Sequence, residues 1–280
     1  MIRPPAPLST IFRDLVNRFR ADIPALRRTG RYALLPELCV NCLGKDARQG
    51  LCSGCRSDLP INHTCCHRCG LPLILAMPRP GLICGECLKH PPAYDRAFMP
   101  WRYEFPVDRM ISHYKYHRQR AFGRPLLADM AGHVEAYLAA CPDQRPDLLV
   151  PAPMHRQRER QRGFNQAAEI AEAISQRTGI PWSGQRVRRV RKSAAQSGLD
   201  RQERLRNLRG VFEVNGEVPA HLAIVDDVVT TGATMRTLAW LLRKHGAERI
   251  QVWALARTPA HSGHQGFYMT GNGETGRESG

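Results

Sequence analysis

The sequence predicts an α/β protein, in which a parallel sheet with flanking helices is preceded by a small metal-binding module. Between residues 148 and 256, short apolar runs typical of buried strands alternate with stretches of helical periodicity. This alternation is the order expected of a parallel sheet with right-handed crossovers. Earlier in the chain, four Cys-x-x-Cys pairs lie in a stretch with few long apolar runs. We therefore divide the chain into a leader (1–35), a cysteine module (36–92), an α/β domain (93–259) and a polar, Gly-rich tail expected to be disordered (260–280).

The overall charge favours an anionic partner. Lys and Arg number 41 against 25 Asp and Glu, a formal net charge of +16, which suits a phosphorylated ligand, nucleic acid or both. No run of about 18 apolar residues occurs, so the sequence predicts no membrane span, and the N-terminus has no signal-peptide pattern. The spacing of the cysteines is typical of zinc in a reducing compartment rather than of disulfides. We therefore expect a cytoplasmic protein.

The leader contains one amphipathic stretch, Ile11–Phe19, in which apolar residues at helical spacing are separated by arginines. A basic helix of this kind either packs on its own protein or lies on a membrane or a partner. The second alternative would place the protein peripherally at the inner face of the membrane.

The cysteine module predicts two structural zinc sites. A Cys-x-x-Cys knuckle offers two thiolates to one face of a zinc tetrahedron, so two knuckles complete a site. Zinc then substitutes for the missing apolar core and contributes on the order of 10 kcal/mol of folding free energy. The spacing leaves the pairing open, sequential or interleaved. Cys65 is a rival for Cys66 as a ligand, and His63 or His67 is an alternative. The predicted ligands are Cys39, Cys42, Cys52, Cys55, Cys66, Cys69, Cys84 and Cys87.

The segment Ile224–Thr234, IVDDVVTTGAT, predicts a site for a ribose 5-phosphate. Ala223–Val225 has the pattern of a buried parallel strand, and Asp226 and Asp227 stand where it ends. Ligands of open α/β sheets bind outside the carboxyl ends of the strands. The turn that follows opens a helix, and its backbone amides suit a phosphate, whereas the two carboxylates suit sugar hydroxyls or Mg²⁺. No partner cation for the carboxylates is evident, so we expect their replacement by Asn to abolish ligand binding without lowering the melting temperature.

Two further stretches are rich in arginine and predict anion sites. After a short strand, Leu148–Val150, the segment His155–Gln166 alternates arginines with other residues up to Gly163 and is expected to be an arginine loop. A helix is expected from Phe164 to about Thr178. Val187–Gln196 is again basic and is expected to be a mobile loop. Arginine forks suit pyrophosphate or a nucleic-acid backbone. The basic candidates are Arg156, Arg158, Arg160, Arg162, Arg188, Arg189, Arg191 and Lys192.

The remaining elements follow from periodicity and from Pro or Gly boundaries. The expected elements are a strand or hairpin at Ala97–Phe105, helices at Val107–Tyr116, Leu126–Ala140, Leu199–Leu208 and Met235–His245, and strands at Val211–Val214 and Ile250–Ala256.

IVDDVVTTGAT resembles the phosphoribosyl pyrophosphate (PRPP) binding motif of type I phosphoribosyltransferases. The resemblance implies that Asp226 and Asp227 hold the ribose 2- and 3-hydroxyls and contribute to catalysis, with Mg²⁺ bridging pyrophosphate and ribose. It also implies that Thr230–Thr234 hold the 5-phosphate. The implied PRPP-binding set is Asp226, Asp227, Val228, Val229, Thr230, Thr231, Gly232, Ala233 and Thr234.

From about Leu38 to Thr258, the order of motifs resembles the ComF/GntX family, a double zinc ribbon followed by a type I phosphoribosyltransferase-like domain. The family is linked with DNA uptake during natural transformation and with the use of DNA as a nutrient. Besides the knuckles and IVDDVVTTGAT, the resemblance rests on CGLPL (Cys69–Leu73), YKYH (Tyr114–His117), QRGFNQ (Gln161–Gln166) and AAQSGLDRQERLRNLRGVF (Ala194–Phe212).

Two hypotheses from different classes follow. The first is an enzyme that transfers ribose 5-phosphate from PRPP to an acceptor, with the loop Arg188–Lys192 closing over the pyrophosphate. The second is a non-catalytic competence factor that holds nucleotides or single-stranded DNA, its arginines neutralising phosphates and its Trp or Tyr rings stacking on bases. A competence helicase is a further candidate partner. The resemblance does not settle the reaction or the acceptor.

Overall fold

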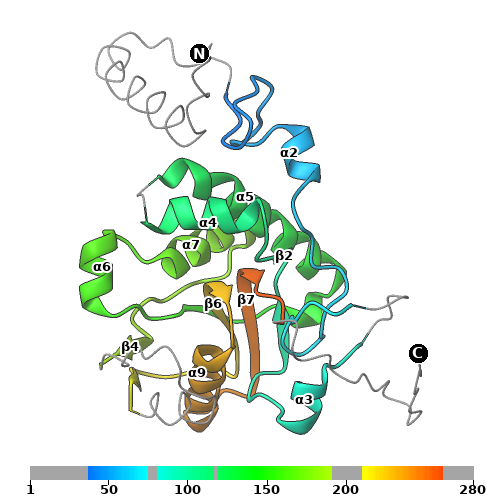
Figure 1. The fold of residues 1–280 in the computed structure, drawn as a ribbon. Helices are drawn as coiled ribbons and strands as arrows, with labels where there is room; N and C mark the ends of the chain where they lie inside the picture. Colours follow the sequence, from blue (N-terminus) through cyan, green and yellow to red (C-terminus); the bar gives the residue numbers. More distant parts are fainter. Residues whose placement is uncertain (1–36, 75–80, 117–118, 191–209, 261–280) are drawn as a thin grey trace, which may run out of the picture.

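The protein is described by a computed structural model for residues 37–74, 81–116, 119–190 and 210–260. Within these residues, the centre is a five-stranded parallel sheet in the order β1-β7-β6-β3, with β2 also paired to β7 (Figure 1). This arrangement confirms the predicted parallel sheet. The strands are β1 (Arg96–Phe98), β2 (Trp101–Arg102), β3 (Leu148–Pro151), β6 (His221–Val229) and β7 (Arg249–Arg257).

Strands β6 and β7 form the middle of the sheet and carry the motif of paired carboxylates. Their apolar runs are buried, as expected for parallel strands covered on both faces by helices. The pairing continues as far as Val229, opposite Arg257. Strand β6 is therefore longer than the predicted run Ala223–Val225, and Asp226 and Asp227 lie within the strand rather than after it.

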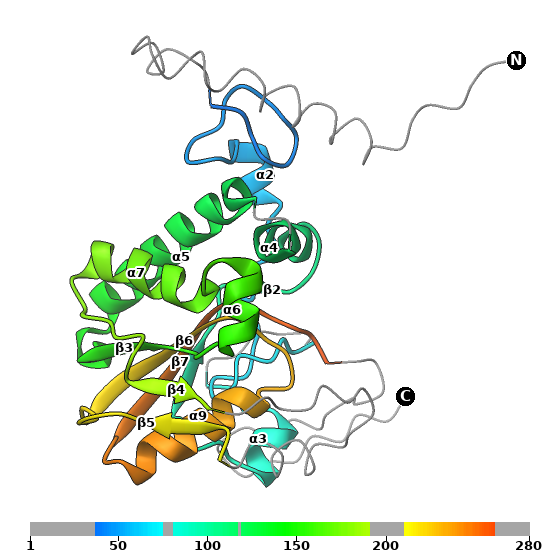
Figure 2. The same cartoon turned by 90° about the vertical axis from the view of Figure 1, so that its left-hand side faces the viewer.

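Helices cover both faces of the sheet (Figures 1 and 2). On β6, Leu222 and Ile224 face the core that contains α9, whereas Ala223 and Val225 face the core that contains α4, α5 and α7. This alternation follows from the two-residue period of a strand. The helices are α4 (Val107–Tyr116), α5 (Arg120–Ala140), α7 (Gln166–Thr178) and α9 (Ala233–Lys244), and a 3₁₀ turn η2 (Pro142–Gln144) follows α5.

Helices α4 and α5 pack closely because Gly123 faces Tyr114. A Cβ atom at Gly123 would lie 2.6 Å from the Tyr114 ring, so a larger residue does not fit there without a shift. This contact lies before Pro125, in the part of α5 that the sequence analysis missed. The helix begins at Arg120 and not at the predicted Leu126, because its first turns are already packed on α4.

Residues 97–105, predicted as a strand or a hairpin, form two short strands. Both β1 and β2 run parallel to β7, so they are not an antiparallel hairpin. Pro100 lies between them and has no N–H with which to continue a ladder of hydrogen bonds.

The first arginine-rich stretch is a helix, α6 (Arg156–Arg162), and not the predicted loop. The side chain of His155 accepts from the amide of Gln157 at its start, and Gly163 ends it with a φ of 84°, a left-handed conformation that glycine adopts without steric cost. The next helix, α7, begins at Gln166 and not at Phe164, because Asn165 caps it by accepting from the amide of Ala167.

The second arginine-rich stretch begins with a strand and not with the predicted loop. Residues Val187–Arg189 form β4, which pairs antiparallel with β5 (Phe212–Val214). Val187 and Phe212 are buried, and this burial explains why the pair is ordered despite its arginines. Residues 191–196 and the predicted helix Leu199–Leu208 lie outside the described residues, as do the leader and the tail.

The cysteine module contains two short helices, α2 (Ser53–Ser57) beside the α4–α5 layer and α3 (Gly85–Lys89) beside α9 (Figure 1). Cys141 is the C-cap of α5 and is only partly buried. Among the described residues, none of the helices combines the length and the apolar character needed to cross a membrane.

Candidate functional site

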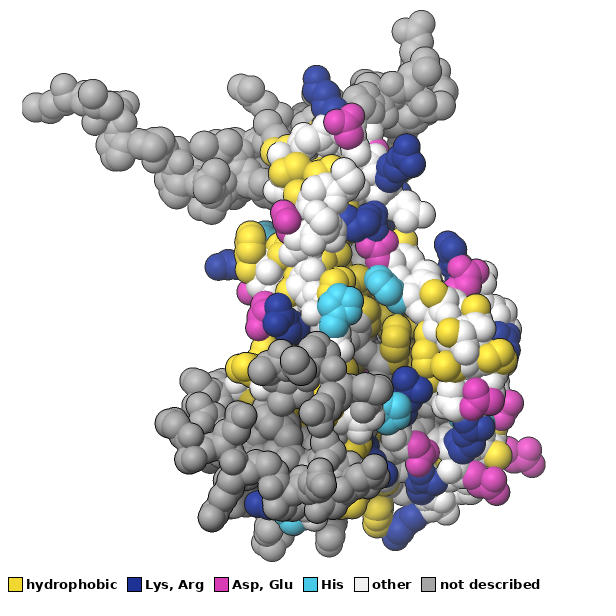
Figure 3. Space-filling model, turned by 90° about the vertical axis from the view of Figure 1, so that its right-hand side faces the viewer, with side chains coloured by type: hydrophobic (Ala, Val, Ile, Leu, Met, Phe, Trp, Pro, Cys, Tyr) yellow, Lys and Arg dark blue, Asp and Glu magenta, His cyan; other side chains and the backbone are white. Residues whose placement is uncertain are grey.

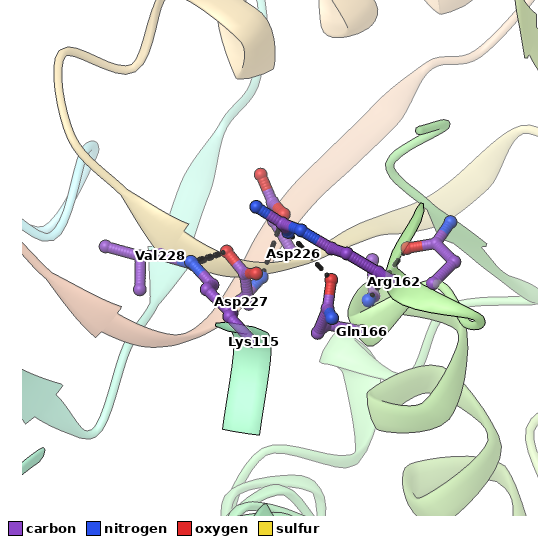
Figure 4. Close-up of polar contacts among 8 residues, drawn as sticks. Lys115, Arg162, Gln166, Asp226, Asp227 and Val228 are labelled. Carbon is purple, nitrogen blue, oxygen red and sulfur yellow. Dashed lines mark hydrogen bonds and ion pairs between the residues drawn. The ribbon is translucent and has the colours of Figure 1, made fainter. Parts of the chain in front are cut away.

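Asp226 and Asp227 lie side by side on β6 and have different partners (Figure 4). Asp227 Oδ1 is 2.9 Å from Nζ of Lys115 on α4, and both side chains are only 13% exposed. Asp226 Oδ1 instead accepts from the amide of Asp227 at 2.8 Å. The expectation that the carboxylates have no partner cation is therefore wrong, because Lys115 neutralises one of them.

The pKa of the Asp226 carboxyl is raised to about 7. Burial is the main cause, because desolvation disfavours the charged form, and the negative charge of Asp227 adds to it. The amide of Asp227 and the charge of Lys115 oppose the rise. Near neutral pH, Asp226 is therefore protonated in a large fraction of the molecules, and a bound cation or a hydroxyl donor would favour its ionised form.

The turn after β6 presents backbone amides next to the carboxylates. Gly232 has a φ of 74° and precedes the first residue of α9, Ala233. The amide of Ala233 donates to Thr231 Oγ1 at 3.4 Å, whereas the amides of Thr234 and Met235 lie in the first turn, where a helix supplies no acceptor. These donors and the positive end of the helix dipole suit a phosphate group.

Arg162, the last residue of α6, is drawn together with the carboxylates in Figure 4, where it contacts Gln166. Its Nη1 atom donates to Gln166 Oε1 at 3.1 Å, and its guanidinium lies 4.9 Å from the centre of the Tyr116 ring. Gln166 is fully buried, and its Nε2 has no hydrogen-bond acceptor within the described part of the chain. Asn165 Nδ2 donates to Ala152 O at 3.2 Å, which fixes the start of α7 to the turn after β3.

The other described arginines of the predicted basic set lie on α6 and β4. Arg158 and Arg160 are exposed on α6, and Arg188 is exposed on β4. The guanidinium of Arg189 lies 5.7 Å from the centre of the Phe212 ring. The pKa of Arg189 is lowered by burial and by the positive charge of Arg158, so α6 and β4 come close enough to form one basic region (Figure 2).

Part of the predicted basic set lies outside the described structure, namely the side chain of Arg156 and the residues Arg191 and Lys192. The face drawn in Figure 3, which turns the side of α3 towards the viewer, carries Lys and Arg interspersed with Asp and Glu. On that face the described residues form no continuous basic patch.

The eight predicted zinc ligands form two clusters in sequential order. In each cluster all four sulfurs lie within 4.8 Å of one another. The Cys42–Cys52 and Cys69–Cys84 sulfur pairs are 3.6 and 3.7 Å apart, close to the edge of about 3.8 Å that follows from a tetrahedron with Zn–S bonds of about 2.3 Å. The residues therefore fit zinc, in closed four-thiolate sites of structural type. Cys65 belongs to neither cluster. The clusters are Cys39, Cys42, Cys52 and Cys55, then Cys66, Cys69, Cys84 and Cys87.

Two residues of this site were missed by the sequence analysis. Lys115 lies in the YKYH stretch, which carried the resemblance but received no role. Arg257 ends β7, is 7% exposed, and its Nη1 donates to the carbonyls of Val229 and Thr230, where β6 leads into the phosphate-type turn. A basic residue at the end of an apolar strand was the only available signal for Arg257.

The fold and the site define a phosphoribosyltransferase-type domain joined to a double zinc ribbon. Residues 32–88 match the family model of the double zinc ribbon domain, and residues 165–270 match that of the phosphoribosyl transferase domain.

Three relatives extend this match over most of the chain. DNA utilization protein YhgH of Salmonella typhimurium is 34% identical over 227 residues, which cover 80% of this chain and 98% of that protein. Competence protein F of Haemophilus influenzae is 34% identical over 231 residues, 78% of this chain and 96% of that protein. Competence protein ComFC of Bacillus subtilis is 25% identical over 218 residues, 74% and 84% of the two chains. The chain therefore belongs to the ComF/GntX family.

Similar solved structures include a purine phosphoribosyltransferase from Pyrococcus horikoshii, with 17% identity over 49% of this chain and 75% of that chain and a TM-score of 0.30. A hypoxanthine phosphoribosyltransferase from Staphylococcus aureus has 13% identity over 48% and 65% of the two chains and a TM-score of 0.33.

Proposed function

We propose that the chain binds PRPP, or a nucleotide with the same ribose 5-phosphate, at the carboxyl end of β6. The observation that carries the proposal is the adjacency of two part-buried carboxylates and a helix-opening turn. Asp226 and Asp227 accept hydrogen bonds from the ribose 2- and 3-hydroxyls, and the amides and hydroxyls of Thr230–Thr234 hold the 5-phosphate. The phosphate cradle follows the carboxylates after Val228 and Val229, so the two could hold the hydroxyl end and the phosphate end of one ligand.

The pyrophosphate of PRPP lies on the side of α6 in this proposal. Arg162 and the exposed Arg158 supply positive charge there, and the free Nε2 donor of Gln166 offers a further hydrogen bond. Mg²⁺ would accompany the ligand and neutralise its pyrophosphate, and Asp226 and Asp227 are the carboxylates that this chain places beside it. The raised pKa of Asp226 supports this placement, because burial and the adjacent charge of Asp227 disfavour its ionised form, which a bound cation would favour.

The reaction that fits such a site is transfer of the phosphoribosyl group. The bond between the anomeric carbon and a pyrophosphate oxygen breaks, pyrophosphate leaves with the electron pair, and the acceptor supplies the pair for the new bond while losing a proton. The anomeric carbon becomes positively charged during this step, so the ionised carboxylates of Asp226 and Asp227 stabilise it electrostatically.

A second candidate function is the binding of single-stranded DNA by the same domain. The observation that favours it is the basic region of α6 and β4. The side chains exposed there are those of Arg158, Arg160 and Arg188. Such side chains neutralise phosphates along a strand. The exposed Tyr116 ring beside Arg162 offers a stacking surface next to that region.

We further propose a role in DNA uptake or DNA utilisation, because the relatives that share most of the chain are named for these processes. The same proposal includes structural zinc in both cysteine clusters and a competence helicase as partner. It also includes a cytoplasmic location with peripheral contact at the inner membrane face.

Calorimetry with PRPP and Mg²⁺ tests the binding proposal, and a pyrophosphate-release assay over a panel of nucleobases tests turnover. We expect Asp226→Asn and Asp227→Asn each to weaken PRPP binding about tenfold to a hundredfold, because a charge-assisted hydrogen bond contributes about 1.5–3 kcal/mol. Asp143→Asn, on the exposed turn η2, is the matched control and should bind normally. PRPP binding at equal strength in the wild type and in both variants would contradict the assigned site.

A further inference from the structure

The two zinc ribbons pack on opposite faces of the sheet. The first ribbon (residues 37–59) contributes Cys39 to the core of α4, α5 and α7, and Cys42 is exposed. The second ribbon (residues 62–74 and 81–90) has all four cysteines buried in the core that also contains the end of β6 and the start of α9. Among the described residues, the second ribbon is therefore the one whose cysteines belong to the same core as Val229, Ala233 and Met235.

Arg257 joins the second ribbon to that turn. Its Nε donates to the carbonyl of Cys69, a predicted zinc ligand, at 3.3 Å. Its Nη1 donates to the carbonyls of Val229, at 3.0 Å, and of Thr230, at the point where β6 ends. One planar, buried guanidinium thus binds the knuckle and the turn at the same time. A lysine has no such fork and could not reach both groups.

Arg236 makes a second link, from the first turns of α9. Its Nη1 donates to His90 O at 2.8 Å, and its Nη2 lies 4.0 Å from Cys87 Sγ. The hydroxyl of the buried Tyr94, just after the ribbon, is a neighbour of the turn, because a Cβ atom added at Gly232 would lie 3.9 Å from it, at ordinary van der Waals distance. The turn is therefore held by the second ribbon from both its β6 side and its α9 side.

The charges of these groups suit a filled zinc site. Four thiolates outweigh the charge of one Zn²⁺, so the cluster is negative when the metal is bound. Arg257 and Arg236 lie beside it, and within the described part of the chain neither of them forms an ion pair with a carboxylate. When zinc leaves, the four cysteines are no longer held together, so the Cys69 carbonyl and Cys87 Sγ lose their fixed positions beside Arg257 and Arg236.

We propose that the second zinc ribbon, through Arg257 and Arg236, positions the turn Val229–Ala233, so that zinc in this ribbon governs the affinity of the turn for a phosphorylated ligand. The first ribbon has no such effect. The consequence for the ligand rests on the function proposed above, whereas the coupling between ribbon and turn does not.

Hydrogen exchange of the ligand-free protein, followed by mass spectrometry, tests the coupling. Loss of the second zinc in Cys84→Ser should speed exchange in peptides spanning residues 229–236 by about tenfold or more, because the turn loses its support. Arg257→Lys and Arg236→Met, which keep all zinc ligands, should do the same to a smaller extent. Cys42→Ser, which opens the exposed first cluster, is the control and should speed exchange only in residues 37–59 and in the facing part of α5.

The ligand consequence is tested by calorimetry with PRPP and Mg²⁺. The Cys84→Ser, Arg257→Lys and Arg236→Met variants should bind about tenfold or more weakly, and Cys42→Ser as the wild type does. The proposal would be overturned if exchange at residues 229–236 were unchanged both in Arg236→Met and in a Cys84→Ser protein that has lost one zinc. It would also be overturned if Cys42→Ser sped exchange at residues 229–236 as much as Cys84→Ser does. If the wild type binds no PRPP but the exchange pattern is as expected, the proposed function fails and the coupling stands.

Discussion

Asp226 and Asp227 are chemically identical neighbours whose surroundings give them different partners. Asp227 has the ammonium group of Lys115 at 2.9 Å, whereas Asp226 has only an amide donor and the negative charge of its neighbour. Because a strand directs successive side chains to opposite faces, the two carboxylates meet different environments. This difference leads to two separate predictions for substitutions that look alike in the sequence.

Replacing Asp226 by Asn should stabilise the ligand-free protein above neutral pH. The folded-state pKa of about 7 lies above the ordinary value of 3.8. The contribution of this group to stability is therefore fully present at low pH and is lost as the pH rises through about 7. We expect Asp226→Asn to raise the free energy of unfolding at pH 8 by about 1–3 kcal/mol and to change it little at pH 4.

Urea unfolding at the two pH values measures this effect, with Asp143→Asn as the exposed control. A loss of stability at pH 8 in Asp226→Asn would show that the charged carboxylate supports the fold.

Replacing Asp227 by Asn should have the opposite sign. The substitution leaves the ammonium group of Lys115, which is 13% exposed, without its partner. We expect a cost of about 1–3 kcal/mol, less than for a completely buried pair because some solvent reaches both groups. The double variant Lys115→Met/Asp227→Asn should recover most of the loss.

A double-mutant cycle at pH 7 measures the coupling between Lys115 and Asp227, and additive effects would mean that the ion pair contributes nothing.

At the scale of elements, the helix α6 and the strand β4 form the basic region. Arg158 precedes Arg162 by four residues and lies on the same side of α6, whereas Arg160 lies on another side. Arg158 and Arg160 are exposed, and Arg162 contacts Tyr116 and Gln166. Solvent-facing arginines bind phosphates by counterion release, and that binding falls steeply with salt.

We expect Arg158→Ala/Arg160→Ala to reduce the salt slope of single-stranded DNA affinity by about one to two units on a log–log plot. Fluorescence anisotropy over a salt series measures it. The control pair Arg124→Ala/Arg249→Ala removes the same charge from α5 and β7, where the side chains are 71% and 47% exposed. Equal reductions in both double variants would mean that net charge, and not this region, binds DNA.

Hydrophobic periodicity predicted the central strands of the sheet but not the elements α6 and β4. The apolar runs of β3, β6 and β7 were recognisable because burial on both faces demands them. The arginine run Arg156–Arg162 has no apolar face, so periodicity could not distinguish a helix from a loop. Only the structure shows that His155 and Gly163 cap the two ends of a helix there. Strand β4 was missed for a related reason, because only Val187 of its residues is fully buried.

At the scale of the molecule, the two cysteine clusters attach to different cores and differ in exposure. Metal analysis should give about two zinc per chain. We expect a chelator to remove zinc in two steps, first from the cluster of the exposed Cys42 and later from the buried cluster of Cys66. The first step should leave the melting of the α/β domain nearly unchanged. A single step, or a folded protein with no zinc, would contradict this order.

The sequence alone determined the α/β class, the zinc knuckles and the position of the proposed ribose phosphate site. Each of these depends on residues close together in the chain, namely a strand and the turn after it or two cysteines of one knuckle, so local geometry already places their side chains. The tertiary structure decided the rest. It paired the knuckles in sequence order, set Lys115 against Asp227, extended β6 past its carboxylates and joined Cys69 to Thr230 through Arg257. These contacts join segments that are distant in sequence, and they form only when the packing of two cores on one sheet brings those segments together.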